Sequence, residues 1–438
     1  MSPEHLRAKQ FYESGRFDEA ARQCSTILTR DPQDPEANHL IGLVFYRQGQ
    51  SQAALPFLQR AVATGRGSAR AFSNLGAVLS ELGDLDQAIS AYHRAIDLDP
   101  ANPWPLNNLG VLYRTRGRLD AAIEAFRRAL LIKPDLADAQ VNLRLVYSMI
   151  VPQWHFAMLN DSARNDAYEA AIRRAVAGKR VLEIGTGAGL LAMMAARAGA
   201  ASVDSCEAVG VIAREAAAIV AKNGFADRIK IIPKHSTAIV AGRDIPARAD
   251  VLITETFSSN LLDEAILPSL EHAHSHLLTG QAVVIPKAAA AMGFLIGGEA
   301  VGGMLSAQRI KGFDLSTFNE FAPPRLVVPL HGIPFEALSA DAELLRFELT
   351  QAEFRMGGRE VALPVTGTGT CYGVALWIRL DLDDDIRFSN RPGESGGSSH
   401  WPNIIYRFPN PLSVTTGQAL RVFARHDRAE INIDLLTP

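Results

Sequence analysis

Small and apolar residues recur with a period of 34 positions through residues 1–150. Each period contains two runs of apolar residues with helical spacing. The small residues at fixed positions of the period are Gly42, Gly76 and Gly110 in the first run, and Ala20, Ala54, Ala88 and Ala122 in the second. The pattern predicts two antiparallel helices per period, which approach each other closely where the small residues cross.

This period is that of the tetratricopeptide repeat, and it predicts an all-α tetratricopeptide solenoid over residues 1–150. We expect four repeats, the first with Ala8 at the crossing position, and one further helix near residues 137–149. Asparagine recurs at the same period, at Asn74, Asn108 and Asn142. These side chains either line the concave groove and hydrogen-bond a peptide, or are surface asparagines without a ligand.

Residues 151–285 show a different pattern, in which strand-like apolar runs alternate with helical segments. The strand-like runs lie in KRVLEIG, VDSCEAV, IKIIPKHST and ADVLITET. Strands that alternate with helices form parallel, doubly wound sheets. The pattern therefore predicts an α/β Rossmann-like domain.

Residues 286–438 contain short alternating strands separated by turn residues, as in LLRFELTQAEF, GVALWIRLDL, NIIYRF, ALRVFARH and AEINIDLL. This pattern predicts an antiparallel β-barrel or sandwich. The most apolar long stretch, residues 288–305, is interrupted by Glu299 and five glycines. We therefore do not expect it to span a membrane.

The composition indicates an ordinary soluble protein, with 47% hydrophobic and 21% charged residues among 438. The net charge of −3 gives no reason to expect a nucleic acid or an anionic membrane as partner. Three distant cysteines make a disulfide framework unexpected and favour a cytoplasmic location. No signal peptide is expected at the N-terminus. No metal site is expected either, because His272, His274 and His276 have only Glu271 nearby as a further ligand.

A glycine turn follows the first strand of the α/β region. Residues 185–189 read GTGAG, so Gly185 and Gly187 permit a tight turn and a close approach of a ligand to the backbone. Glu183 precedes the turn, and Glu207 ends the next strand, where an acid binds a ribose diol. This arrangement is similar to that of class I methyltransferases, which bind S-adenosylmethionine, although another α/β enzyme could contain such a turn.

Two glutamates, Glu255 and Glu264, follow the fourth predicted strand in TETFSSNLLDE. Two carboxylates on one loop repel each other unless a cation lies between them. A guanidinium suits this position because its donors form a planar fork. The pair predicts a site that grips an arginine side chain, and the alternative is a structural or surface role for both acids.

From Trp154 onward the chain resembles the protein arginine methyltransferases, and within them the branch of the seventh and ninth human members. The resemblance rests on WHFAMLNDSARNDAYEAAI, EIGTGAGLLAMMAARAGA, IKIIPKHST, TETFSSNLLDEAILPSLEHAHSHL, and the triplet Ser399-His400-Trp401 in place of threonine-histidine-tryptophan. All five segments occur in the order of that family. The resemblance implies methyl transfer from S-adenosylmethionine to a protein arginine.

The resemblance also implies roles for single residues. Those near the cofactor are Arg164 at its carboxylate, Gly185 and Gly187 through backbone atoms, Glu183 beside the cradle, Glu207 at the ribose, Ser236 or Thr237 near adenine, and Met158 beside the methyl group. Those near the substrate are Glu255 and Glu264 as the guanidinium clamp, His400 paired with Asp161, and Trp401 as a wall of the pocket. Glu264 is the expected proton acceptor, and His400 with Asp161 is the alternative.

We therefore expect a protein arginine N-methyltransferase whose repeats, through Asn74, Asn108 and Asn142, recruit the protein or peptide substrate. A homodimer formed through an arm near residues 300–330 is also expected. Two alternatives are an inactive peptide-binding scaffold and a methyltransferase of a non-protein or non-arginine acceptor.

Overall fold

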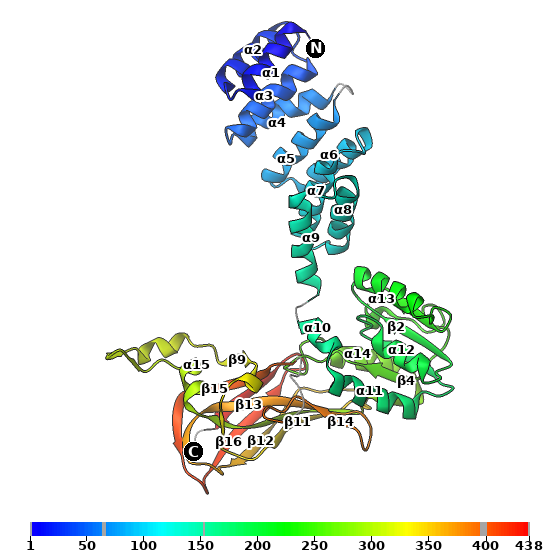
Figure 1. The fold of residues 1–438 in the computed structure, drawn as a ribbon, viewed down its shortest axis with the longest axis vertical. Coiled ribbons are helices and arrows are strands. Elements are labelled where there is room, and N and C mark those ends of the chain that lie inside the picture. The colour runs from blue at the N-terminus through cyan, green and yellow to red at the C-terminus, as the bar shows by residue number, and fades with distance from the viewer. Residues whose placement is uncertain (1, 64–66, 152–153, 395–400, 437–438) are drawn as a thin grey trace. The chain divides into compact units, whose positions relative to one another are not determined.

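Paired helices fill the N-terminal unit of the chain, Met1–Pro152, and a second unit covers Gln153–Pro438. The computed structural model describes residues 2–63, 67–151, 154–394 and 401–436, and Figure 1 shows its elements. The helices of the first unit are α1 (Pro3–Glu13), α2 (Phe17–Arg30), α3 (Pro35–Arg47), α4 (Ser51–Ala63), α5 (Ala69–Glu81), α6 (Leu85–Leu98), α7 (Pro103–Thr115), α8 (Leu119–Ile132) and α9 (Ala137–Ile150). Four helix pairs followed by α9 confirm the predicted solenoid.

The crossing glycines explain why the helices of each pair pack so closely. A Cβ atom on Gly76 would lie 2.8 Å from the ring of Tyr92, and one on Gly110 would lie 2.5 Å from the ring of Phe126. Both distances are shorter than van der Waals contact, so any larger side chain would force the helices apart. The period of small residues is therefore a packing requirement.

A five-stranded parallel sheet in the order β3-β2-β1-β4-β5 begins the second unit. Its strands are β1 (Arg180–Ile184), β2 (Ser202–Cys206), β3 (Ile229–Ile232), β4 (Ala249–Thr254) and β5 (Leu278–Ile285). Its helices are α10 (Trp154–Leu159), α11 (Ser162–Ala175), α12 (Leu190–Arg197), α13 (Gly210–Lys222), η1 (Ser236–Ala238), α14 (Ile266–His272) and the π-helix η2 (Ala273–Leu277). The parallel sheet with its helices confirms the predicted Rossmann-like fold.

Antiparallel sheets follow, as predicted. The larger sheet has the order β10-β6-β13-β15-β9, with β11 paired to β6 and β14 to β13, and a second sheet has the order β12-β16-β17. These strands are β6 (Ala288–Gly297), β9 (Arg325–Val328), β10 (Glu336–Ala337), β11 (Ala342–Glu348), β12 (Gly357–Pro364), β13 (Gly369–Asp381), β14 (Arg387–Ser389), β15 (Asn403–Val414), β16 (Ala419–His426) and β17 (Ile431–Leu436). A short 3-10 turn, η4 (Leu330–Gly332), follows β9.

The most apolar stretch of the chain is the strand β6, which is buried along its whole length in the middle of the larger sheet. Its burial on both faces accounts for its unbroken apolar sequence. None of the helices in the described parts of the chain is both long and apolar enough to cross a membrane.

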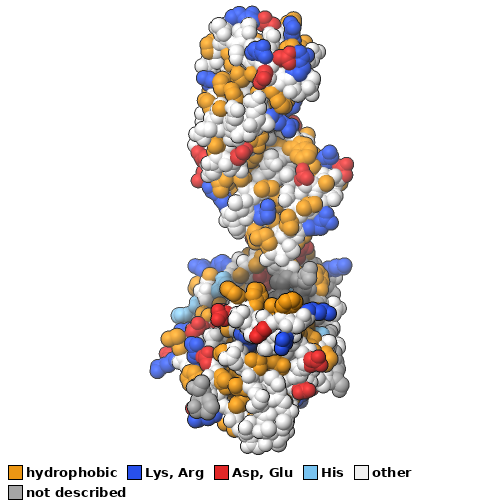
Figure 2. Space-filling view, turned by 90° about the vertical axis from the view of Figure 1, so that its left-hand side faces the viewer, with side chains coloured by type: hydrophobic (Ala, Val, Ile, Leu, Met, Phe, Trp, Pro, Cys, Tyr) orange, Lys and Arg blue, Asp and Glu red, His pale blue; other side chains and the backbone are white. Residues whose placement is uncertain are grey.

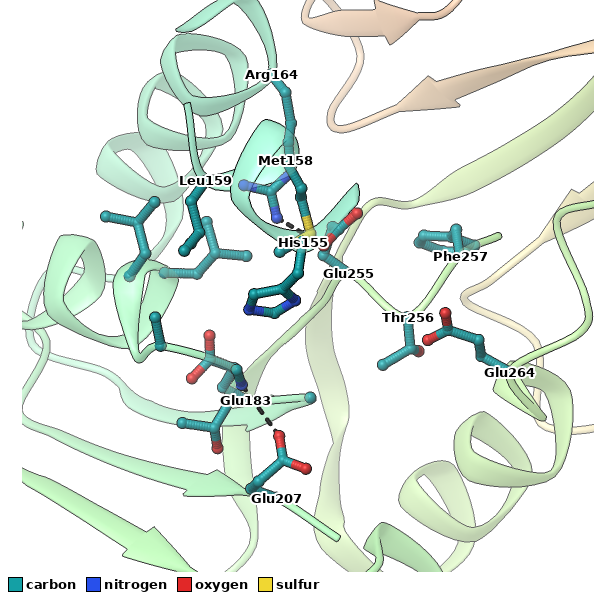
Figure 3. A pocket seen from close by; sticks show the side chains of 16 residues that line it. His155, Met158, Leu159, Arg164, Glu183, Glu207, Glu255, Thr256, Phe257 and Glu264 are labelled. Atoms are coloured by element: carbon teal, nitrogen blue, oxygen red, sulfur yellow. Dashed lines mark hydrogen bonds and ion pairs between the residues drawn. The ribbon is translucent and has the colours of Figure 1, made fainter. Parts of the chain in front are cut away.

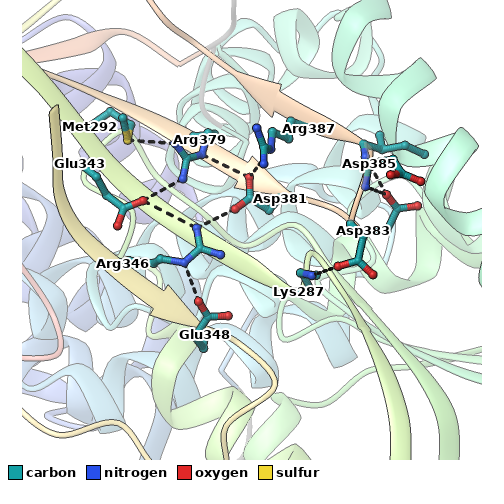
Figure 4. Close-up of polar contacts among 12 residues, drawn as sticks. Lys287, Met292, Glu343, Arg346, Glu348, Arg379, Asp381, Asp383, Asp385 and Arg387 are labelled. Carbon is teal, nitrogen blue, oxygen red and sulfur yellow. Dashed lines mark hydrogen bonds and ion pairs between the residues drawn. The ribbon is translucent and has the colours of Figure 1, made fainter. Parts of the chain in front are cut away.

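Charged side chains connect neighbouring strands of the larger sheet (Figure 4). The carboxylate of Asp381, which is 6% exposed, accepts from Arg346 Nη1 at 2.7 Å and lies 3.2 Å from the Nε atoms of both Arg379 and Arg387. Asp383, in the turn that follows β13, pairs with Arg174 of α11 at 3.0 Å. The antiparallel region is thus fastened to α11, the helix directly before the parallel sheet.

An arm projects from the antiparallel region between β6 and β9 (Figure 1). It contains α15 (Glu299–Leu305), β7 (Arg309–Ile310), β8 (Phe313–Asp314) and η3 (Ser316–Phe321). Phe313, Phe318 and Phe321 are 71%, 69% and 78% exposed. Figure 2 views the molecule from the side on which the arm projects, and hydrophobic side chains gather on this face of the second unit. The rings of Phe318 and Phe321 lie 5.5 Å apart, yet all three side chains stay mostly exposed.

Candidate active site

The glycine turn between β1 and α12 forms the floor of a pocket. Gly185 has a φ of +88° and Gly187 a φ of +51°. Residues other than glycine rarely adopt a positive φ. A Cβ atom on Gly185 would lie 2.5 Å from Cγ2 of Thr256. The backbone N–H of Gly187 donates to Glu207 Oε2 at 3.1 Å, which holds that carboxylate at the end of β2. The turn therefore presents backbone atoms, without side chains, to the pocket beside the oriented carboxylate of Glu207.

Glu183 lies on β1 beneath the turn and is almost completely buried, at 1% exposure. Burial raises the pKa of this carboxyl group to about 8, although a hydrogen bond from Ser205 opposes the rise. Its Oε1 atom makes no hydrogen bond within the described residues. A buried acceptor of this kind is costly unless a ligand satisfies it.

Arg164 of α11 meets the first clamp glutamate. Its Nη2 donates to Glu255 Oε2 at 2.6 Å, and the two side chains are only 3% and 5% exposed. Its Nη1 donates to Asn165 at 2.7 Å, whereas the buried Nε has no hydrogen-bond partner within the described residues. Arg164 thus has one donor atom, and Glu183 one acceptor atom, without a hydrogen-bond partner among the described residues, and both residues line the same pocket.

The two clamp glutamates reach the same pocket, with Thr256 between them in Figure 3. Glu264 as a whole residue is exposed, although protein surrounds its carboxyl group closely enough to desolvate it. Partial burial of its carboxyl group and the negative charges of Glu255, Asp263 and Glu207 raise its pKa to about 6. A cation placed between the two carboxylates would remove this repulsion.

Eight of the residues predicted from the sequence line this one pocket: Met158, Arg164, Glu183, Gly185, Gly187, Glu207, Glu255 and Glu264. They come from α10, α11, the ends of β1 and β2, and the loop after β4 (Figure 3). The carboxyl ends of parallel strands are where ligands bind in such sheets. The described pocket has an unpaired buried donor and an unpaired buried acceptor, so it fits a ligand with both a carboxylate and an ammonium group.

The other selected residues lie elsewhere, and their roles stay predictions. Asp161 caps α11, and its side chain accepts from Arg164 N at 3.0 Å. Ser236 is buried and donates to Ser269 at 2.9 Å. Trp401 is buried in the antiparallel region, with its ring 5.7 Å from that of Phe388. His400 lies outside the described residues.

The repeated asparagines bond to neighbouring repeats. Asn74 Nδ2 lies 2.8 Å from His39 Nε2, and Asn142 Nδ2 donates to Asn107 Oδ1 at 3.2 Å. The Oδ1 of Asn108 accepts a longer bond of 3.4 Å from Asn107. The first two bonds join the first helices of successive repeats, α3 to α5 and α7 to α9, whereas Asn107 and Asn108 are adjacent in α7. Peptide binding by this ladder stays a prediction.

His155 on α10 is a pocket residue that sequence analysis did not select. A Cβ atom on Gly187 would lie 3.4 Å from its Cε1, so the ring lies over the glycine turn. The signal was weak, because a single histidine in a short helix before the first strand has no partner at any recognisable spacing. Phe257, 2% exposed, also lines the pocket and was missed, because a single apolar residue in a loop belongs to no recognisable motif.

The buried carboxyl group of Glu183 makes the stability of the ligand-free protein depend on pH. A folded-state pKa near 8, above the ordinary value of 4.5, means that the folded protein holds a proton that the unfolded chain has released between these values. We expect the free energy of unfolding to fall as pH rises from about 5 to 8, and Glu183→Gln to remove part of that fall. Urea denaturation at several pH values measures both slopes, and identical slopes would contradict this assignment.

Comparisons with known proteins agree with these features. Tetratricopeptide repeat families match residues 5–69 and 67–135. Two solved structures share the fold: the Trypanosoma brucei PRMT1 enzyme–prozyme heterotetrameric complex with AdoHcy, with a TM-score of 0.57 and 22% identity over 66% of this chain and 95% of that one, and Arabidopsis thaliana protein arginine methyltransferase 10, with a TM-score of 0.53 and 21% identity over 64% and 90%.

Curated relatives match 62–63% of this chain. An arginine N(omega)-methyltransferase of Streptomyces achromogenes is 38% identical over 62% of this chain and 75% of its own length. Protein arginine N-methyltransferase 7 of Bos taurus is 32% identical, and human protein arginine N-methyltransferase 9 is 30% identical. This chain spans 44% and 36% of the lengths of these two relatives. The chain therefore belongs to the arginine methyltransferase family, and tetratricopeptide repeat families match its N-terminal part.

Proposed function

We propose that this protein transfers a methyl group from S-adenosylmethionine to a guanidinium nitrogen of an arginine in a protein substrate, which its repeats recruit. The observation that carries the proposal is the convergence of Glu255 and Glu264 on the pocket that also contains the glycine turn, Glu207 and the unpaired groups of Arg164 and Glu183. One half of this pocket suits the cofactor, and the other half suits a cation.

The residues on the cofactor side have charges opposite to those of the methionine part of S-adenosylmethionine. The buried Nε of Arg164 would receive the carboxylate of the methionine part, and the buried Oε1 of Glu183 would accept from its ammonium group. Glu207 would accept from the ribose hydroxyls, because its carboxylate is already oriented by the N–H of Gly187. When bound, S-adenosylmethionine supplies an activated methyl group on a sulfonium centre.

On the acceptor side, Glu255 and Glu264 would hold the guanidinium from two directions. A guanidinium has its positive charge spread over three nitrogens, and paired carboxylates draw that charge toward the two nitrogens that they bind. The third nitrogen is then directed at the methyl group with more of its lone pair available. The carboxylates thus supply both orientation and electrostatic stabilisation.

The proton that the acceptor nitrogen loses needs an acceptor of its own. Glu264 suits this task because its pKa, raised to about 6, brings it closer to the pH of the reaction than that of an ordinary carboxyl group. Glu255 is held by Arg164 at 2.6 Å and suits an orienting role. The division of labour follows from the different surroundings of the two acids.

Free arginine is a second candidate acceptor, because the Streptomyces relative is named an arginine N(omega)-methyltransferase and not a protein arginine methyltransferase. The test supplies labelled S-adenosylmethionine with either an arginine-rich protein or free L-arginine, and compares the wild type with Glu255→Gln/Glu264→Gln. Labelled protein that disappears in the double variant supports the proposal. Label in free arginine alone supports the second candidate, and the absence of label in both would contradict both.

We also propose that the arm docks on a second copy of this chain. Its three phenylalanines expose apolar side chains on a projecting segment (Figure 1), and such surfaces mark interaction sites. We expect Phe318→Ser/Phe321→Ser to shift a dimer to a monomer in sedimentation velocity experiments. Met356→Ser is the matched control, because Met356 is 71% exposed outside the arm. A monomeric wild type would contradict the proposal.

A further inference from the structure

Asn260 lies in the middle of the loop that connects the two clamp glutamates, yet it is only 1% exposed. Its Nδ2 donates to Asp263 Oδ1 at 2.9 Å, directly before Glu264. Its Oδ1 accepts from the backbone N–H of Ile431 at 3.2 Å. One side chain therefore connects the clamp loop to β17, the last strand of the described chain, which lies 171 positions further along the sequence.

Tyr406 of β15 completes this junction from a third element. Its hydroxyl donates to the carbonyl of Ile431 at 2.5 Å, and the same oxygen lies 3.4 Å from Asn260 Oδ1. A phenol has one proton to donate, so the shorter bond to Ile431 is the main one. Tyr406 thus fixes the strand to which Asn260 is bonded.

The loop has a backbone that needs such support. Leu261 has a φ of +68° and Ala265 a φ of +55°, and left-handed conformations are unfavourable for residues other than glycine. Leu261 directly follows Asn260, and Ala265 directly follows Glu264. Strained residues persist only where surrounding contacts determine their conformation, and the bonds of Asn260 are such contacts.

A second tie fixes the helix that follows the loop. Glu271 of α14 pairs with Arg428 in the turn between β16 and β17, and it also accepts from the backbone N–H of Phe354 at 3.0 Å. The β16–β17 turn therefore holds α14 through Arg428, while Ile431 holds the loop through Asn260. The hairpin of β16 and β17 therefore contacts the chain both before Glu264, at Asn260, and after it, at Glu271.

From this geometry we propose that Asn260 is the positioning residue of the guanidinium clamp, and that it sets the separation and direction of Glu255 and Glu264 by tying their loop to Ile431 of β17. This inference rests on the proposed function for the identity of the acceptor. Asn260 lines no part of the described pocket, so its effect on the reaction passes through the two glutamates. The antiparallel region thereby becomes part of the catalytic apparatus.

The test compares Asn260→Ala with the wild type in methyl transfer to an arginine-containing peptide. We expect kcat/KM for the peptide to fall about 100-fold, because a small displacement of a catalytic group has an effect of that size. The dissociation constant of S-adenosylhomocysteine should change less than about twofold, since the glycine turn, Glu183 and Glu207 are untouched. Tyr406→Phe should lower kcat/KM in the same direction but less, and should add little in the Asn260→Ala background.

Asn403→Ala is the matched control, because Asn403 is also a buried asparagine of the second unit, 3% exposed, and donates to Asn390 O at 3.2 Å away from the clamp loop. Equal losses of kcat/KM in both variants, or an equal loss of cofactor affinity in Asn260→Ala, would reduce Asn260 to a general packing role and overturn the proposal.

Hydrogen–deuterium exchange separates this proposal from the proposed function. Asn260→Ala should accelerate exchange in residues 256–265, and Asn403→Ala should not. Unchanged exchange in this segment would overturn the positioning role even if activity fell. If the wild type methylates no acceptor, the proposed function fails, and faster exchange in Asn260→Ala would still show that Asn260 holds the loop.

Discussion

Replacing Glu264 with glutamine should lower kcat for methyl transfer by about 10²–10³-fold, the usual effect of removing one preorganised charged or polar group from a transition state. Glutamine keeps the shape of the side chain but cannot neutralise a guanidinium or receive its proton. The affinity for S-adenosylhomocysteine should stay nearly constant, because the groups proposed to bind the cofactor are Arg164, Glu183 and Glu207. Single-turnover kinetics and calorimetric titration measure the two quantities.

The pH profile identifies the role of Glu264 more specifically. With a pKa raised to about 6, the wild-type carboxyl group takes up a proton as pH falls through that value, so kcat/KM should decline below it. Glu264→Gln should lose this limb of the profile. Glu353→Gln is the control, because the Glu353 side chain is 78% exposed and outside the pocket. Wild-type activity in Glu264→Gln would remove Glu264 from the mechanism.

The features that sequence analysis predicted are those with a local origin. The solenoid was predictable because each crossing glycine contacts a helix of its own repeat, as Gly110 does with Phe126, 16 positions away. The pocket was largely predictable because the ends of parallel strands meet at one edge of a sheet. Glu183, Glu207 and Glu255 all follow or end such strands, so their convergence needed no long-range information.

The features that were missed depend on contacts between distant segments. β6 is buried on both faces, so its sequence has no alternation and reads only as an apolar stretch. The bond from Arg164 to Glu255 joins residues 91 positions apart, and nothing in either segment indicates it. Asn260 lies in a loop where polar residues are ordinarily solvated, so its burial against β17 was not predictable from its neighbours.

Arg164→Met should destabilise the second unit by about 3–5 kcal/mol, because it leaves Glu255 as a buried charge without its guanidinium partner. The pair is well shielded from solvent, with side chains 3% and 5% exposed, so little of the interaction is lost to screening by water. Methionine fills a similar volume along the helix α11 and keeps its apolar contacts. Chemical denaturation followed by circular dichroism measures the change.

The double variant Arg164→Met/Glu255→Gln separates the cost of a buried carboxylate that has lost its guanidinium from the loss of packing. Since a neutral amide costs far less to bury than a carboxylate, the double variant should recover most of the lost stability while methyl transfer stays abolished. A double variant as unstable as Arg164→Met would mean that the guanidinium stabilises the fold through packing and its bond to Asn165. Recovery of stability without recovery of activity would show that the fold does not need the ion pair of Arg164 and Glu255. The pair would then be required for the reaction.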